Sequence, residues 1–445
     1  MPRNHKIGTG PGAMRLGPAL AALALLAGCM GGADTPSMLQ THKDAGPGSV
    51  AAAGSLAPQK EVQSSLIADL QARKSVLPQG GAYAQVSDAV IAASAGAAEA
   101  ELRVARLKAE ARAKNWLPSI GPSVNLTSLG GLAASLLLEQ GLFDNGRRKA
   151  EREFASADVE VAAVSLSVSM NQRVYEGLSY YVNAERARAQ ASVAEQAAGR
   201  LQEFGSIMRK RVAGGISDGS EQQVLDQRVA EMQATVAQDR QAEASALSEL
   251  EAVAGRSLAG VSGLNVLADA AGAEPLSVLK SRGEGARAVA QAKMQIAGLK
   301  PGIAATAEVD EGGISPSLKL TGGGLLNPGA GADIAALEQT GDVVDRQTAE
   351  AAESANRRIV ALQAKKSNLA TRQAQGAEVL RQTESNLALF TEQYKVGRRS
   401  LLELVGQYDA FARLQRDQAS LRFDIALIDL EIARDRGVLV DGARL

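Results

Sequence analysis

Apolar residues recur at spacings of three and four along parts of the chain. Leu225, Val229, Met232 and Val236 follow this spacing, which is the seam of a coiled coil. Long helices are predicted at about residues 147–213, 218–255, 342–396 and 400–437. The first is roughly 100 Å long at 1.5 Å per residue. This length exceeds that of an ordinary globular helix and requires a coiled-coil or helical-barrel setting.

Proline and glycine interrupt the helical pattern at two corresponding places. Pro118 and Pro301 each follow a helical stretch and open a segment in which apolar and polar residues alternate. Glycine-rich turns divide each segment, as expected for paired strands. The sequence therefore predicts two strands within about residues 118–143 and two more within about residues 301–338.

The chain repeats itself once, with an offset of 182 residues. Gly397 falls on Gly215, Ser400 on Asp218, and Glu403 on Glu221. Each copy has a glycine that can end a helix, followed by a Ser/Asp-x-x-Glu capping box that can start the next one. Repeats of this length indicate a pseudo-symmetric assembly.

The helices that follow the two turns match only in part. Leu421 and Ile425 in the second copy fall on Asp239 and Glu243 in the first. The two acidic residues interrupt the apolar seam, which resumes in the same phase at Ala246. Both helices then end at glycine, again 182 residues apart.

The first residues are interpreted as a processing signal. A basic start and an apolar stretch precede Cys29, whose preceding residues fit a bacterial lipobox. The interpretation predicts a signal peptide at 1–28, Cys29 carrying acyl chains such as palmitate, and a tether at 29–63. An ordinary signal peptide with an unmodified cysteine is the alternative, and Met14 offers a second possible start. The repeats then occupy 64–255 and 256–445.

Composition narrows the functional classes. Cys29 is the only cysteine, so an intrachain disulfide is excluded, and the two histidines lie in the signal peptide and the tether. No His-based triad or zinc site is therefore expected in the mature chain. Without the signal peptide, the chain has 45 basic and 49 acidic residues. This charge balance does not indicate nucleic-acid binding. We expect that the protein is not an enzyme and that it has no cofactor and no metal site.

This arrangement resembles the TolC-type outer-membrane factors over nearly all of the mature chain. The motifs that carry the likeness are WLPS at 116–119, LFDNGRRK at 142–149 and YKVGRRSLLE at 394–403. The resemblance implies a mainly α fold with a small β part and two pseudo-repeats of long antiparallel coiled-coil helices. It also implies four β-strands per protomer and a homotrimer, in which a 12-stranded β-barrel in the outer membrane continues a trimeric α-helical barrel in the periplasm.

The resemblance also assigns roles to the two turns. Tyr394 and Arg399 match residues that latch a closed channel end, and their partners match Glu221 and Ser220. Glu403 matches the first of two acidic aperture residues, whereas the second position is glycine. The alternative is that the arginines are solvated and the glutamates serve only as caps. The turns would also dock an adaptor, through Gly215, Asp218, Gly397 and Ser400.

The expected function is a passive outer-membrane duct of a tripartite efflux or type I secretion system, anchored by lipid at Cys29. Its partners would be a periplasmic adaptor (a membrane fusion protein), an inner-membrane pump and outer-membrane lipid. A periplasmic adaptor-like protein and a structural coiled-coil lipoprotein are the alternatives, and a hydrolase is more distant. One departure concerns residues 303–320, where Glu308, Asp310 and Lys319 interrupt a segment with few flanking aromatics.

Overall fold

The computed structural model describes residues 64–444 except residues 95, 127–131, 269–271, 311–312 and 323–328. The signal peptide at 1–28, the lipidation site Cys29 and the tether at 29–63 lie outside these residues. Within the described part, the fold is mainly helical with one small antiparallel sheet, as predicted.

The two repeats contribute a similar order of elements. In the first half these are α1 (Ser65–Ala72), α2 (Ala82–Ala92), α3 (Ala97–Ala113), β1 (Ser119–Leu126), β2 (Leu132–Phe143), α4 (Arg147–Ala213) and α5 (Gly219–Ala254). In the second half these are α6 (Leu276–Leu299), β3 (Gly302–Asp310), β4 (Gly313–Thr321), α7 (Ala330–Glu338), α8 (Thr340–Lys395) and α9 (Leu401–Asp435). A short 3₁₀ helix, Gly442–Arg444, follows.

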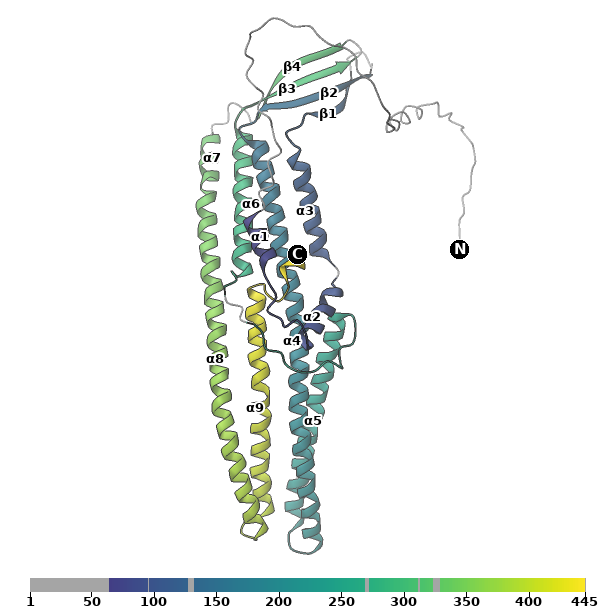
Figure 1. Ribbon diagram of the computed structural model, residues 1–445, viewed down its shortest axis with the longest axis vertical. Helices are drawn as coiled ribbons and strands as arrows, with labels where there is room; N and C mark the ends of the chain where they lie inside the picture. Colours follow the sequence, from purple (N-terminus) through teal and green to yellow (C-terminus); the bar gives the residue numbers. More distant parts are fainter. Residues whose placement is uncertain are drawn as a thin grey trace, which may run out of the picture. The chain divides into compact units, whose positions relative to one another are not determined.

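The long helices form a layer that is four helices wide (Figure 1). Near the sheet, the order across the layer is α3, α4, α6 and α8; in the other half it is α5, α4, α9 and α8. Only α4 and α8, with 67 and 56 residues, run through both halves. The turn between α4 and α5 and the turn between α8 and α9 lie at the end opposite the sheet.

The shorter helices meet end to end along the long ones. A Cβ on Gly437, just after α9, would lie 2.6 Å from Leu276 at the start of α6. A Cβ on Gly255, just after α5, would lie 3.3 Å from Ala93 after α2. Both glycines have positive φ, 64° for Gly437 and 67° for Gly255, so each returning helix ends in the left-handed conformation that glycine allows.

Two apolar clusters hold the layer together. The central cluster joins α1, α2, α4, α5, α6 and α9 at mid-length, and includes Tyr83, Val90, Leu178, Tyr181, Leu250, Leu279, Phe423 and Leu430. The tip cluster joins α4, α5 and α9 near the two turns, and includes Leu201, Phe204, Met208, Leu225, Met232, Leu401, Leu404 and Ala412. Much of the buried face of α4 is alanine, which allows close approach of its neighbours.

The chain ends are tied into the middle of the layer. The buried Asn171 of α4 accepts hydrogen bonds from the backbone N–H groups of Leu439 and Val440, at 2.8 and 3.3 Å. Val76 donates to the carbonyl of Val438 and accepts from the N–H of Ala268. Segments from both repeats therefore share backbone pairing at mid-length, which no local sequence pattern indicates.

The structure adds detail to two sequence predictions. The second strand pair fills only part of the predicted interval of residues 301–338: β4 ends at Thr321, and Ala330–Glu338 is helix α7. Alanine and leucine are strong helix formers and this segment contains no β-branched run, so helix is favoured. The helical stretch before Pro118 forms two helices, α2 and α3, and the second begins after Gly96, where φ is 62°.

Candidate functional site

The turn between α4 and α5 ends the first helix with a Schellman motif. Gly215 has a φ of 70° and its N–H donates to the carbonyl of Val212 at 3.0 Å. The N–H of Ile216 reaches back to the carbonyl of Arg211 at 2.9 Å. These two bonds satisfy carbonyls that the end of the helix leaves open.

The turn between α8 and α9 has the same backbone geometry, 182 residues later. Gly397 has a φ of 77° and donates to the carbonyl of Tyr394 at 3.0 Å, while Arg398 donates to the carbonyl of Gln393 at 2.9 Å. The hydroxyl of Ser400 accepts from the N–H of Glu403 at 3.2 Å, and the Glu403 carboxylate accepts from the N–H of Ser400 at 2.9 Å. This is a complete capping box.

The capping box predicted at the first turn is only half formed. The carboxylate of Asp218 accepts from the backbone N–H groups of Ser220 and Glu221, at 2.7 and 3.1 Å, and contacts the Ser220 hydroxyl. Among the described hydrogen bonds, the Glu221 side chain makes none back to Asp218. The three donors favour the charged carboxylate, so they lower the pKa of Asp218 below its ordinary value.

The residues expected to form a latch lie on their own turns in this protomer. The Arg399 guanidinium donates to the Gln393 side chain at 3.1 Å, lies 3.4 Å from the Glu403 carboxylate and sits 4.8 Å from the centre of the Phe390 ring. Tyr394 is half-buried against the tip cluster. No hydrogen bond between described residues joins Tyr394 or Arg399 to the other turn, and the latch stays a prediction.

Within the turn, Glu403 has a defined role as the carboxylate of the capping box. The N–H of Ser400 and the nearby Arg399 lower the pKa of its carboxyl, in that order of importance. The side chain is exposed, and it is negatively charged at neutral pH. It therefore places a fixed negative charge at this end of the helical layer.

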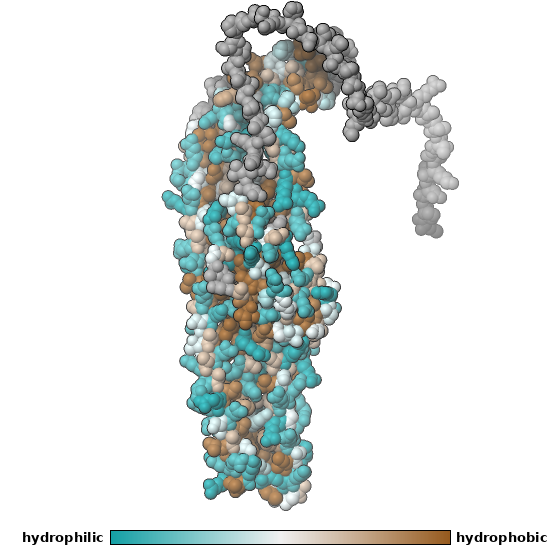
Figure 2. All heavy atoms as spheres, viewed as in Figure 1, coloured by the Kyte–Doolittle hydropathy of each residue, from teal (hydrophilic) through white to brown (hydrophobic). Residues whose placement is uncertain are grey.

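The sheet at the opposite end has two chemically different faces. Its strands are antiparallel in the order β1-β2-β3-β4, with a register shift between Gly141 and Phe143. Residues paired across neighbouring strands point to the same side. One face carries mostly apolar residues: Ile120, Pro122, Leu136, Leu138, Ile303, Ala305, Ala307, Val309, Ile314, Pro316, Leu318 and Leu320. Figure 2 shows apolar side chains gathered over the sheet.

The other face collects most of the polar residues of the same strands, although Gln140 lies on the apolar face. It carries Ser119, Ser123, Ser135, Glu139, Thr306, Glu308, Ser315, Ser317 and Lys319, together with Leu137 and Ala304. The charged residues that appeared to interrupt the strands therefore alternate with apolar ones rather than replacing them. Leu318 and Ile314, on the apolar face, are 74% and 70% exposed in this protomer, so this face has no partner within the described residues.

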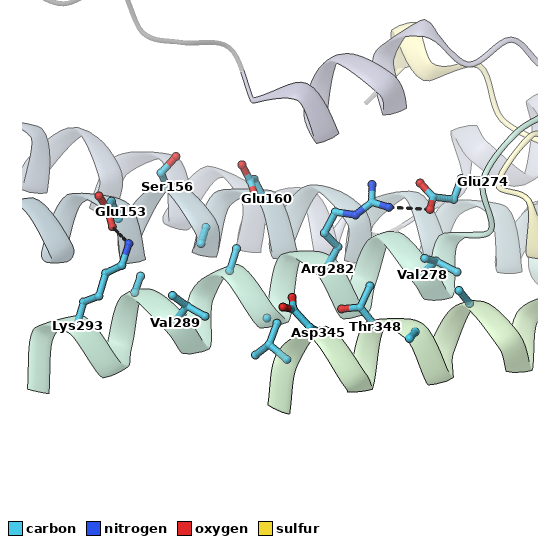
Figure 3. A pocket seen from close by; sticks show the side chains of 17 residues that line it. Glu153, Ser156, Glu160, Glu274, Val278, Arg282, Val289, Lys293, Asp345 and Thr348 are labelled. Atoms are coloured by element: carbon cyan, nitrogen blue, oxygen red, sulfur yellow. Dashed lines mark hydrogen bonds and ion pairs between the residues drawn. The ribbon is translucent and has the colours of Figure 1, made fainter. Parts of the chain in front are cut away.

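A groove of about 820 Å³ lies between α4, α6 and α8 (Figure 3). Its lining combines apolar side chains, such as Val278 and Val289, with charged ones. Lys293 of α6 lies 2.9 Å from the Glu153 carboxylate of α4, and Arg282 lies 2.7 Å from Glu274. These charges cross-link neighbouring elements and shape the wall of the layer.

Two observations concern membranes and metals. No helix in the described residues is both long enough and apolar enough to cross a membrane. The same residues contain no group of three or more histidine, cysteine or acidic side chains placed to hold a metal ion.

The sequence shows acidic residues that interrupt the apolar seam of α5, but it does not show which residues pair with them. Asp239 pairs with Arg416 of α9, and Glu243 pairs with Arg188 of α4. A charged residue at a seam position signals a partner on a neighbouring helix. The sequence does not say which helix supplies that partner.

No family model and no curated protein matches this sequence. Solved structures do match. The outer membrane protein VceC from Vibrio cholerae has a TM-score of 0.70 and 14% identity, covering 80% of this chain and 96% of that one. The CmeC outer membrane channel of Campylobacter jejuni has a TM-score of 0.67 and 11% identity, covering 81% and 88%.

The open state of the Neisseria gonorrhoeae MtrE outer membrane channel has a TM-score of 0.66 and 14% identity, covering 81% of this chain and 90% of that one. At this level of identity the likeness concerns the fold. The chain has the fold of the TolC-type outer-membrane channels, and this confirms the resemblance carried by its motifs.

Proposed function

We propose that this protein is the outer-membrane duct of a tripartite efflux or type I secretion system. Three protomers would close their sheets into a 12-stranded barrel and their helical layers into a tunnel across the periplasm. The duct would be passive, drawing energy from an inner-membrane pump through a periplasmic adaptor. The likeness to outer-membrane channels in fold supports a duct rather than an enzyme.

The observation that carries the proposal is the two-faced sheet at one end of the helical layer. Four strands are too few to close a barrel, and β1 and β4 are left as open edges. Twelve strands from three copies would pair both edges of every protomer. The apolar face would then meet lipid and the polar face would line an aqueous path.

The same observation weighs against the two alternatives. A structural coiled-coil lipoprotein has no need of a sheet with an exposed apolar face. An adaptor would carry one helical hairpin, whereas this chain has two, α4–α5 and α8–α9, with matched turns at Gly215 and Gly397.

Roles for individual residues are part of the proposal. Cys29 would carry the acyl chains that anchor the protein to the outer membrane. The two turns would face the adaptor, and Tyr394 and Arg399 would latch to Glu221 and neighbouring Ser220, between or within protomers. Charge-assisted hydrogen bonds of this kind can hold a bistable element until a partner competes.

Single-channel conductance of the detergent-purified protein in a planar bilayer, together with its oligomer mass, tests the proposal. The expected result is a trimer with a cation-preferring conductance. A monomer that never conducts would contradict the duct and favour an adaptor or a periplasmic coiled coil. A Cys29→Ser form that restores export to a deletion strain would separate the duct from its anchor.

A further inference from the structure

Three ion pairs join α4, α5 and α9 within one stretch of the layer, and we call them the polar belt. The belt consists of the pairs Arg186–Asp424, Arg188–Glu243 and Asp239–Arg416. The first joins α4 to α9, the second α4 to α5, and the third α5 to α9, so each helix is tied to both others. The two pairs that involve α4 have N···O distances of 3.0 and 2.8 Å.

On α5 and α9, most of the polar belt lies between the two apolar clusters, whereas Asp424 directly follows Phe423 of the central cluster. Along α5, the tip cluster reaches Val236 and the central cluster begins at Leu247, so Asp239 and Glu243 stand between them. Along α9, the tip cluster ends at Ala412 and the central cluster begins at Phe423, with Arg416 between. The apolar core that holds the turns together is therefore separate from the core at mid-length.

The pair between Asp239 and Arg416 differs from the others in burial and geometry. The Asp239 side chain is only 5% exposed, and the Arg416 side chain 28%. Nε of Arg416 lies 2.9 Å from one carboxylate oxygen, and its Nη2 contacts the other, which makes the pair bidentate. Hydrogen bonding to Asp239 raises the pKa of Arg416, so the guanidinium remains charged.

This pair is also the only ion pair between α5 and α9, both of which are described in full. Helix α5 starts at one turn and α9 starts at the other. Separating the α8–α9 hairpin from the α4–α5 hairpin must therefore break this pair. Separation breaks the two charge-assisted hydrogen bonds of the bidentate pair, which favours the arrangement in which the hairpins lie together.

We propose that Asp239 and Arg416 form a clasp that holds the α8–α9 hairpin against α5 and thereby sets the balance between the closed and open channel end. The clasp rests on the proposed duct function. It lies well inside the helical layer: Arg416 is 16 residues after Ser400, or roughly 24 Å along α9. It is therefore distinct from any latch formed by Tyr394 and Arg399 at the turns.

The test is single-channel recording of the full-length trimer with Arg416→Gln. Arg240→Gln is the matched control, because Arg240 pairs with Glu195 of α4 at 2.8 Å near the same level but does not touch α9. We expect Arg416→Gln to raise the ratio of open to closed time about tenfold, within the range of coupling between elements. Arg240→Gln should leave the ratio at the wild-type value.

A double variant covers the case in which Arg416→Gln fails to assemble. Asp239→Asn with Arg416→Gln removes both charges and keeps polar side chains of similar size, so no unpaired charge is buried. It should assemble as a trimer and show the same raised open fraction. Trimer mass and helix content by circular dichroism identify which variants have folded.

The outcomes distinguish a failure of the clasp from a failure of the proposed duct function. A conducting wild type whose open fraction is unchanged in the folded variants overturns the clasp and leaves the duct standing. An equal rise in Arg240→Gln also overturns the clasp, because the effect would then belong to any charge lost at this level. A wild-type trimer that never conducts overturns the duct, and the clasp with it.

Discussion

An arginine in place of Leu318 tests which face of the sheet meets lipid. Leu318 lies in β4, directly opposite Ala305 of β3, on the apolar face. Its side chain is 74% exposed in the protomer, so no packing within the protomer needs to change to accept a longer residue. Any effect of Leu318→Arg on insertion therefore reports the environment outside the sheet.

The expected magnitude follows from the cost of placing a charge against lipid. An arginine on the lipid face of a transmembrane barrel costs about 2–4 kcal/mol near the midplane and less near the interfaces. Three copies in the proposed trimer would bring the total to roughly 6–12 kcal/mol per assembly if each copy contributes independently. That total is comparable to the whole stability of a typical domain, so we expect membrane assembly to be largely lost.

Ser317→Arg is the matched control, one residue away on the opposite face. Ser317 pairs with Thr306, their hydroxyl groups lie 2.7 Å apart, and the same face of β4 already accommodates Lys319. Loss of the hydroxyl contact should cost about 1 kcal/mol, and the charge should cost little beside water. We expect this variant to assemble at close to the wild-type yield.

The assay is recovery of trimer in the outer-membrane fraction, supported by refolding of purified protein into lipid vesicles. We predict that the Leu318→Arg trimer is lost from the outer-membrane fraction and that the Ser317→Arg trimer is recovered. The reverse pattern would mean that the faces are assigned the wrong way round. Equal, wild-type recovery of both variants would mean that neither face of the sheet contacts lipid.

Three further predictions concern the helices. Gly397→Ala should lower the free energy of unfolding by about 1 kcal/mol in chemical denaturation, because φ is 77° while the space around a Cβ is open; an unchanged midpoint would contradict this strain. Leu250→Ala should cost about 2–5 kcal/mol in the same assay, since the side chain is fully buried in the central cluster, and a loss below 1 kcal/mol would show that the site relaxes. The lowered pKa of Asp218 means that its cap is fully formed above the ordinary pKa of about 4 and is lost as pH falls through the lowered value. Amide exchange at Ser220 and Glu221, corrected for intrinsic rates, should therefore accelerate below that pH, and Asp218→Asn should abolish this acceleration.

The turns were predictable because their chemistry is local. A glycine that can adopt positive φ, followed by Ser or Asp three residues before a glutamate, defines a helix end and a helix start within seven residues. The structure forms both Schellman motifs at Gly215 and Gly397. What the motif could not settle was the Glu221 side chain, whose return bond to Asp218 depends on its rotamer and not on spacing.

Long-range contacts were the part that the sequence could not supply. Asp239 was visible as a break in an apolar seam, but its partner Arg416 is 177 residues away and carries no distinguishing pattern. Asn171 likewise reads as an ordinary polar residue in a helix, although it accepts two backbone hydrogen bonds from the end of the chain. Helix α7 at residues 330–338 lies inside the interval predicted to contain strands, and the sequence does not separate it from the neighbouring glycine-rich loop.

The burial of the four long helices indicates how copies would complete the layer. In the half away from the sheet, α4 and α9 are the inner helices; over their whole lengths they have 25 and 10 buried residues. The two outer helices differ sharply: α8 buries only two residues over 56, and α5 six over 36. In a closed ring of three copies, both under-packed edges become buried when one edge joins the other edge of the neighbouring copy. In the proposed trimer, α8 of each protomer would therefore pack on the partner's α5, the helix that the clasp connects to α9. Movement of an α8–α9 hairpin would then strain the contact with the next copy, so the three hairpins would be expected to open together.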